Sequence, residues 1–266
     1  MTSSKSICQS IEADVLSWGT VRAWPEQLAA WRKQPKPMTP EPFAPALIRQ
    51  SEDQTIAALW ATCEAIAGMD ANADTFDEWS IIAAPRLMGR SGNATSFERY
   101  RAEGPWGISP HVIPHHSLHA ISGTISQILK AHGPNFGVGN GPRQSVDGWL
   151  TAATLLSEEN CAGLWLILVG HTDEYLPPLG EGATAPRVEC EAVALALAPS
   201  RGDRGGLHLR ICPEELMPRA EPNIAFLASL REFSLSGLVD DLTRRDAAPA
   251  SMWRLPGSGW LEIEMR

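Results

Sequence analysis

Short apolar runs alternate along the chain with longer segments that repeat their apolar positions at helical spacing. Residues 164–170 (LWLILVG) are continuously apolar, which is typical of a strand buried on both faces of a sheet. Residues 79–84 (WSIIAA) predict a second short buried strand, which ends at Pro85. Further strands are expected over 135–139, 192–198, 207–211 and 260–265, with a turn joining the second and third of these.

Helices are expected in the segments between these strands. Residues 46–68 carry an apolar face and end at Gly68, and residues 114–131 begin with a proline and repeat apolar positions from Leu118 to Leu129. Six prolines between residues 25 and 45 exclude a long helix there. Shorter helices are predicted over 26–33, 96–102, 143–157, 225–231 and 235–244. The alternation favours an α/β fold with helices on the faces of a sheet.

Composition narrows the class of protein. The 266 residues are 44% hydrophobic and carry a net charge of -9, which argues against a nucleic-acid or anionic-membrane partner. Five dispersed cysteines favour reduced thiols in the cytoplasm, and the first 18 residues lack the apolar core of a signal peptide. The ten tryptophans fit either a protein interface or ordinary packing. No cofactor is implied.

Four histidines lie close together in the sequence, and two pairs among them are four residues apart. They lack the adjacent glutamate and cysteine ligands typical of zinc sites, so surface or interface histidines are favoured over a metal site. The members are His111, His115, His116 and His119.

A glycine-rich turn at residues 137–142 is expected to connect a strand to a helix. The turn does not match a dinucleotide fingerprint, but it places a helix N-terminus where a nucleophile is activated when one is present. Ser145 is the one hydroxyl nearby, without a nucleophile-elbow motif. Asp173 and Glu174 follow the 164–170 strand, where paired carboxylates do acid–base work or simply cap a loop.

Residues 109–177 resemble the N-terminal half of β-ketoacyl synthases of the thiolase superfamily. Gly133-Pro134, the strand 135–139, the buried helix 143–157 and the strand ending in Val169-Gly170 each have a counterpart in that family. The resemblance implies one ketosynthase-like domain over residues 1–266, clearest over 45–200. The fold expected is mainly the N-terminal α/β lobe, with a short C-terminal extension of strands and helices over 201–266.

The departures from the family pattern concern its chemistry. The position of the family's cysteine falls on Pro142, which has no nucleophilic side chain, and the family's His-Gly-Thr motif is absent. Condensation needs a thiolate to carry the acyl chain and imidazoles to stabilise the oxyanion. The chain is therefore expected to be an inactive ketosynthase relative without catalytic residues.

Inactive relatives of this family are chain-length factors, which pair with an active ketosynthase and wall off its acyl tunnel. This chain is similar to those of aryl polyene and xanthomonadin-type pigment pathways, within fatty-acid and polyketide biosynthesis. The resemblance implies a heterodimer, or a homodimer when the chain is alone, with acyl carrier protein bound through the partner. Asn93 and Phe97 would form the tunnel gate. The interface strand would consist of Asn135, Phe136, Gly137, Val138 and Gly139.

Two other classes of function stay open. One is a stand-alone module that binds acyl groups or acyl carrier protein, although like-charge repulsion disfavours acidic partners. The other is a hydrolase that uses Ser145 and a histidine. The acyl chain length, the starter unit and the partner's identity have no signal in the sequence.

Overall fold

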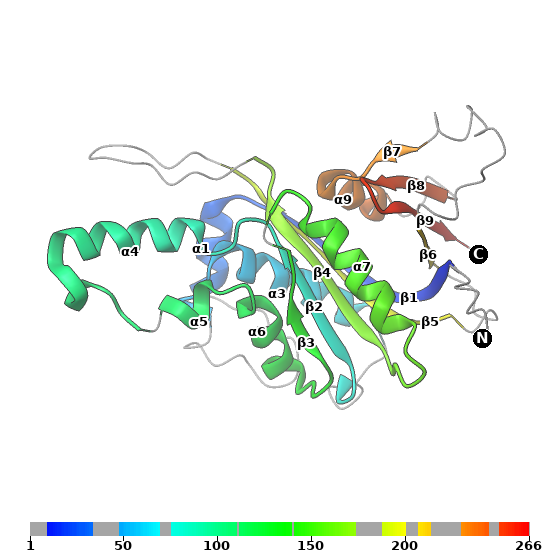
Figure 1. The fold of residues 1–266 in the computed structure, drawn as a ribbon, viewed down its shortest axis with the longest axis horizontal. Coiled ribbons are helices and arrows are strands. Elements are labelled where there is room, and N and C mark those ends of the chain that lie inside the picture. Colours follow the sequence, from blue (N-terminus) through cyan, green and yellow to red (C-terminus); the bar gives the residue numbers. More distant parts are fainter. Residues whose placement is uncertain are drawn as a thin grey trace, which may run out of the picture.

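The computed structural model describes residues 10–33, 48–69, 76–110, 112–139, 141–173, 188–200, 207–213, 230–244 and 250–265. A mixed sheet runs through these residues, with the strand order β3-β2-β4-β5-β1-β6-β9-β8-β7 (Figure 1). Strands from the first and last parts of the sequence therefore belong to the same sheet.

One end of the sheet is parallel. β2 (Ser80–Pro85) lies between β3 (Asn135–Gly137) and β4 (Leu164–His171) and runs parallel to both. Every residue of β2 is buried, and so is every residue of β4 except the last. These two strands confirm the prediction that continuous apolar runs form buried strands.

The middle of the sheet is antiparallel. β1 (Ile11–Ala23) pairs with β5 (Cys190–Pro199) on one side and with β6 (Leu207–Pro213) on the other. β9 (Gly259–Met265) and β8 (Ala250–Leu255) follow in antiparallel order, and β7 (Arg231–Glu232) lies parallel to β8 at the edge. The two strands predicted on either side of residue 200 therefore do not pair with each other, because β1 separates them.

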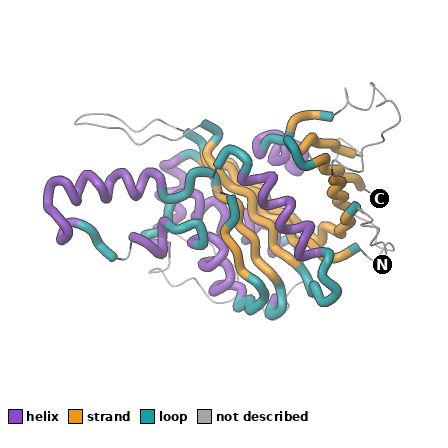
Figure 2. The backbone as a smooth tube through the Cα atoms, viewed as in Figure 1, coloured by secondary structure: helices purple, strands orange, loops and turns teal. Residues whose placement is uncertain are grey.

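Helices cover both faces of the sheet, as Figure 2 shows. α3 (Asp53–Ala67) and α6 (Ala120–Leu129) pack on one face with side chains such as Trp165 and Ile167. α7 (Gln144–Leu156) and α9 (Leu235–Thr243) pack on the other face with the alternate residues of the same strands. α1 (Pro25–Lys33) lies beside α3 and contributes the buried Leu28. The sheet is thus the middle layer of three.

Close packing between α3 and β1 depends on glycine. A Cβ atom added at Gly19 would lie 2.0 Å from the carbonyl oxygen of Ala61. Ser17, two residues earlier in β1, donates a hydrogen bond of 2.6 Å to the carbonyl of Ala65. The helix therefore lies directly on the backbone of the strand.

A segment over residues 90–119 projects from this layered body. It comprises α4 (Arg90–Glu103), the 3-10 helix η2 (Gly104–Gly107) and α5 (Val112–His116). Figure 1 shows α4 extending well beyond the sheet on the left of the view. We call this segment the arm. No helix in the described part of the chain is long and apolar enough to cross a membrane.

Several predicted helices are wrong in their bounds. The helix expected over 114–131 is two helices, because the chain turns at Ser117–His119, where the carbonyl of Leu118 faces Gly137 of β3. α4 begins at Arg90 rather than at residue 96, with Gly89 as its N-cap at φ 80°, and α3 begins at Asp53.

The sequence patterns also missed elements. Arg231 belongs to β7, so the helix expected over 225–231 does not include its last residue; residues 225–229 lie outside the described part of the chain. β1 and β8 were not predicted at all. The shorter helices expected over 26–33, 143–157 and 235–244 are confirmed, each with ends shifted by no more than one residue.

Candidate functional site

The carboxyl ends of the parallel strands meet the N-terminus of α7. Pro85 of β2 lies opposite Val169 of β4, so Arg86 and His171 emerge side by side from the same edge of the sheet. A cavity of about 290 Å³ opens there, which we call the elbow cavity. Its lining combines Arg86 and His171 with residues 142–146 at the start of α7 and residues 232–236 near α9. Ligands of open α/β sheets bind at such a position.

The predicted elbow lies at this cavity. Pro142 lines it and precedes the first residue of α7 by two positions. Gly139 has a φ of 83°, and a Cβ atom there would lie 2.6 Å from the Cα of Gln144, so the turn is as tight as the sequence predicts. Asn140 lies outside the described residues. The elbow thus presents a proline ring where the family resemblance places a cysteine.

Charged groups on the far wall of the elbow cavity are paired. Glu191 is 2% exposed and accepts hydrogen bonds from Arg22 Nε at 2.7 Å and from Ser236 Oγ at 2.5 Å. Arg143 donates to Ser258 Oγ at 3.2 Å. These contacts connect β5, α9 and the β8–β9 turn, so they hold the C-terminal strands against the elbow.

Among the described residues, no cysteine lines the elbow cavity, and burial raises the pKa of three described cysteine thiols. Cys190 lies opposite His171 in the sheet and is fully buried, and burial raises the pKa of its thiol well above the ordinary value. Burial also raises the pKa of Cys161, and that of Cys212 to about 11. Because the thiolate is the reactive form, a raised pKa makes these thiols weaker nucleophiles at neutral pH.

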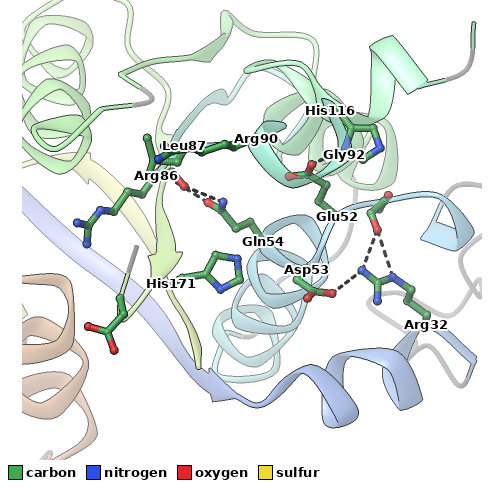
Figure 3. A pocket seen from close by; sticks show the side chains of 12 residues that line it. Arg32, Glu52, Asp53, Gln54, Arg86, Leu87, Arg90, Gly92, His116 and His171 are labelled. Carbon is green, nitrogen blue, oxygen red and sulfur yellow. Dashed lines mark hydrogen bonds and ion pairs between the residues drawn. The ribbon is translucent and has the colours of Figure 1, made fainter. Parts of the chain in front are cut away.

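A second cavity of about 240 Å³ adjoins the first, because Arg86 and His171 line both (Figure 3). We call it the α3 cavity, since the N-terminus of α3 forms its floor. Gln54 donates to the carbonyl of Arg86 at 2.8 Å and accepts from its backbone N–H at 3.1 Å. This paired contact fixes the backbone directly after β2.

Two carboxylates of the α3 cavity, Glu52 and Asp53, are held by hydrogen bonds. Arg32 donates to Asp53 at 2.6 Å and to the carbonyl of Ser51 at 2.9 Å. Glu52 accepts from the backbone N–H of Gly89 at 3.0 Å and pairs with His116 Nδ1. Figure 3 shows Glu52 pointing toward His116 and Asp53 toward Arg32.

His171 lies between the two cavities. Burial lowers its pKa, and the nearby carboxylates of Asp53 and Glu52 only partly oppose this effect. The imidazole is therefore neutral at neutral pH. It lines the same cavity as Ser145, so the structure brings the hydroxyl of the hydrolase hypothesis near a histidine.

The clustered histidines have separate surroundings. His116 pairs with Glu52, and His119 contacts Ser122 Oγ at 3.1 Å. His111 and Glu174 lie outside the described residues, and Asp173 lines the α3 cavity. Within the described part of the chain, no group of three or more histidine, cysteine or carboxylate side chains is placed to hold a metal ion.

The predicted interface strand is the edge of the sheet. Asn135, Phe136 and Gly137 form β3, and Val138 extends its pairing by donating to the carbonyl of Ala83 at 2.9 Å, whereas Gly139 belongs to the elbow. Phe136 is 43% exposed. β3 pairs only with β2 among the described strands, so its outer edge faces away from the sheet.

The two predicted gate residues lie elsewhere, on the arm. Asn93 and Phe97 are one turn apart on α4, and Phe97 is 69% exposed. They are therefore not brought together with the elbow within this chain. The sequence patterns missed four residues that belong to no motif: Glu52, Gln54, Arg86 and His171. They meet because the N-terminus of α3 lies beside the carboxyl ends of β2 and β4.

A large mixed sheet between helical layers, with an elbow at the carboxyl ends of its parallel strands, places the chain in the α/β class. No protein-family model and no curated protein matches the chain. Solved structures do: a type II polyketide synthase acyl-carrier protein in complex with its ketosynthase bound to the hexaketide (AntDE:AntF) matches with a TM-score of 0.59 at 13% identity. This match covers 96% of this chain and 100% of the other.

Two further structures have the same fold. One is the ketosynthase ApeO in complex with its chain length factor ApeC from Xenorhabdus doucetiae (TM-score 0.54, 15% identity, 96% and 100% of the two chains). The other is the ishigamide ketosynthase/chain length factor (TM-score 0.55, 12% identity, 96% and 99%). The predicted fold class is thus confirmed: the chain has the fold of the matched chains in these ketosynthase and chain-length-factor structures.

Proposed function

We propose that the chain is a non-catalytic, chain-length-factor-like subunit that pairs with an active β-ketoacyl synthase and shapes its acyl tunnel. The observation that carries the proposal is Pro142 at the elbow, in a cavity that no cysteine among the described residues lines. The raised pKa values of Cys161, Cys190 and Cys212 support it, because none of these thiols is activated. The fold shared with ketosynthase and chain-length-factor complexes supports the pairing.

The partner would bind along β3. An exposed sheet edge gains a strand when its free backbone groups bond to a second chain. β3 is short and lies at the edge, and Phe136 offers apolar surface to a neighbour. Paired edge to edge, the two subunits would share one continuous sheet.

Asn93 and Phe97 would reach the partner's acyl tunnel from the arm. An aromatic ring stops a growing chain sterically, since each added two-carbon unit would have to overpack against it. The exposure of Phe97 leaves its ring available for such a contact. The proposed products are polyketide or fatty-acid chains of the aryl polyene type. Acyl carrier protein would dock mainly on the partner, because this chain carries a net charge of -9 and would repel an acidic carrier protein.

The test is co-expression with each β-ketoacyl synthase encoded in the same genome, followed by size-exclusion chromatography and reconstitution with acyl carrier protein and malonyl units. We expect a stable one-to-one complex whose products are longer with Phe97→Ala and shorter with Phe97→Trp. Asn93→Ala tests the second gate residue, and Leu150→Ala, an exposed position on α7, is the control. A covalent acyl adduct on any cysteine of the isolated chain would refute the proposal.

A hydrolase is the second candidate, because Ser145 and the neutral His171 line one cavity. It predicts turnover of simple esters by the isolated chain, abolished by Ser145→Ala and by His171→Asn. Equal, background-level turnover in all three proteins would exclude it and leave the subunit proposal intact.

A further inference from the structure

No side chain of the arm whose burial is described is fully buried. Across residues 90–119, every residue whose burial is described is partly or fully exposed, in contrast to α3, which buries 11 of its 15 residues. Four large apolar side chains of the arm are exposed: Phe97 (69%), Tyr100 (50%), Trp106 (97%) and Ile113 (73%). An isolated helix of the length of α4 is marginal in water, so this segment needs support from elsewhere.

Both ends of the arm are held by one carboxylate. Glu52 accepts a hydrogen bond from the backbone of Gly89, directly before α4, and pairs with the ring of His116, the last residue of α5. Glu52 and His116 are only 13% and 18% exposed. Glu52 is also the N-cap residue of α3, which is fixed by its buried face.

The packing around this contact is tight. A Cβ atom at Gly89 would lie 2.3 Å from the carbonyl oxygen of His116, and one at Gly92 would lie 2.2 Å from its ring. The start and the end of the arm therefore pack on each other as well as on Glu52. The arm is a segment of about thirty residues whose two ends are held together, and its large apolar side chains are exposed.

We propose that Glu52 is a positioning residue that clasps both ends of the arm, and that the arm so held is a docking element for the ketosynthase partner. This inference rests on the proposed function for the identity of the partner, but the clasp itself does not. The clasp sets the direction in which α4 leaves the body, and with it the place of the apolar side chains that the partner covers.

The surroundings of the arm favour the ketosynthase as the partner that covers its exposed apolar side chains. α5 leads to Leu118, whose carbonyl packs on Gly137 of β3, so the arm continues into the proposed interface strand. Figure 1 shows α6 next to β3 and α5 on the other side of α6. A second copy of the chain is the weaker candidate, because two subunits of charge -9 repel each other. Several large apolar side chains exposed on one segment are typical of a protein interface.

The clasp is tested by hydrogen exchange on the full chain. Glu52→Ala removes the acceptor, so amide exchange over residues 90–116 rises about tenfold, while exchange in α7 and β4 is unchanged. Glu52→Gln keeps an acceptor for Gly89 and a polar group for His116, and restores most of the protection. Asp53→Asn is the matched control, because Asp53 lies in the same cavity but bonds to Arg32.

Unchanged exchange in the arm of Glu52→Ala, or an arm already unprotected in the wild type, overturns the clasp. A rise in exchange throughout the sheet also overturns it, because Glu52 would then support the whole fold rather than the arm. These readouts need no partner, so they stand even where the proposed function fails.

Docking is tested with the co-expressed ketosynthase complex. Trp106→Ala and Glu52→Ala each weaken binding about tenfold or more, with Leu150→Ala on α7 as the exposed apolar control. A wild-type chain that binds no ketosynthase refutes the proposed function. If the wild-type chain binds a ketosynthase and Trp106→Ala binds it equally well, docking through the arm is refuted and the proposed function stands. Homodimers that Trp106→Ala dissociates would show that a second copy, and not a ketosynthase, is the occupant.

Discussion

Two tryptophans show how differently the sheet and the arm use apolar surface. Trp165 in β4 is fully buried between the helical layers, whereas Trp106 in η2 is 97% exposed. Trp165 contacts Phe76 and Trp79, with ring centroids 5.3 Å and 6.0 Å apart. The same residue type therefore stabilises the fold in one region and remains available to a partner in the other.

The two regions also differ in what fixes their shape. β4 pairs with β2 and β5 along its length and buries its first seven residues. α4 has no side-chain cap, and its contacts with the body include those of Gly89 and His116 with Glu52. Few buried contacts make a region open at low free-energy cost, so the arm belongs to the least stable part of the described structure.

The largest expected effect is in the sheet. Trp165→Ala should lower the free energy of unfolding by about 3–5 kcal/mol, because it leaves a cavity between Phe76 and Trp79. Urea unfolding followed by circular dichroism measures it, with Trp165→Phe as the milder control. A loss below about 1 kcal/mol would mean that this cluster is not part of the stabilising core.

The next effect concerns a buried histidine–aspartate contact in the antiparallel part of the sheet. His208 Nδ1 lies 3.0 Å from Asp14 Oδ1, both side chains are 5% exposed, and Ser200 donates to the same oxygen at 2.8 Å. His208→Ala removes one hydrogen-bond partner of the buried Asp14, so it should lower the free energy of unfolding by about 3 kcal/mol.

A double-mutant cycle separates the pair from simple packing. Asp14→Ala combined with His208→Ala should cost clearly less than the sum of the two single changes in the free energy of unfolding. Additive costs would show that each side chain contributes through its own packing and not through the pair.

The sequence predicted the parts of this sheet that depend on local pattern. β2 and β4 follow from continuous apolar runs, and α7 follows from its periodicity after the glycine turn. β1 was missed because prolines follow it closely and its alternation is interrupted by a bulge between Val15 and Ser17. Nothing local shows that β1 separates β5 from β6, since that order is set by the packing of the whole sheet.

The candidate site was only half predictable. The elbow and Pro142 follow from the chain's own turn residues. The α3 cavity does not, because Glu52, Arg86 and His171 are 34 to 119 residues apart and meet only when the strands align. The break between α5 and α6 was missed for the same reason: residues 114–131 have helical periodicity, but the contacts with Glu52 and Gly137 require a turn.

A smaller, pH-dependent effect is expected where the sheet meets the cavities. Burial lowers the pKa of His171, so the unfolded chain binds a proton near its ordinary pKa of about 6.5, before the folded chain does. Stability should therefore fall as the pH drops below about 6.5, and this part of the loss should disappear in His171→Asn. Urea midpoints at several pH values measure it; parallel curves for the two proteins would contradict a buried neutral imidazole.

The smallest expected change in stability is at Trp106, the counterpart of Trp165. Trp106→Ala should change the free energy of unfolding of the isolated chain by no more than about 0.5 kcal/mol, because the ring contributes little to the folded core. The same urea experiment used for Trp165→Ala measures it under matched conditions. A loss of several kcal/mol would show that the ring packs within the chain, and the arm would then be part of the core rather than a surface kept for a partner.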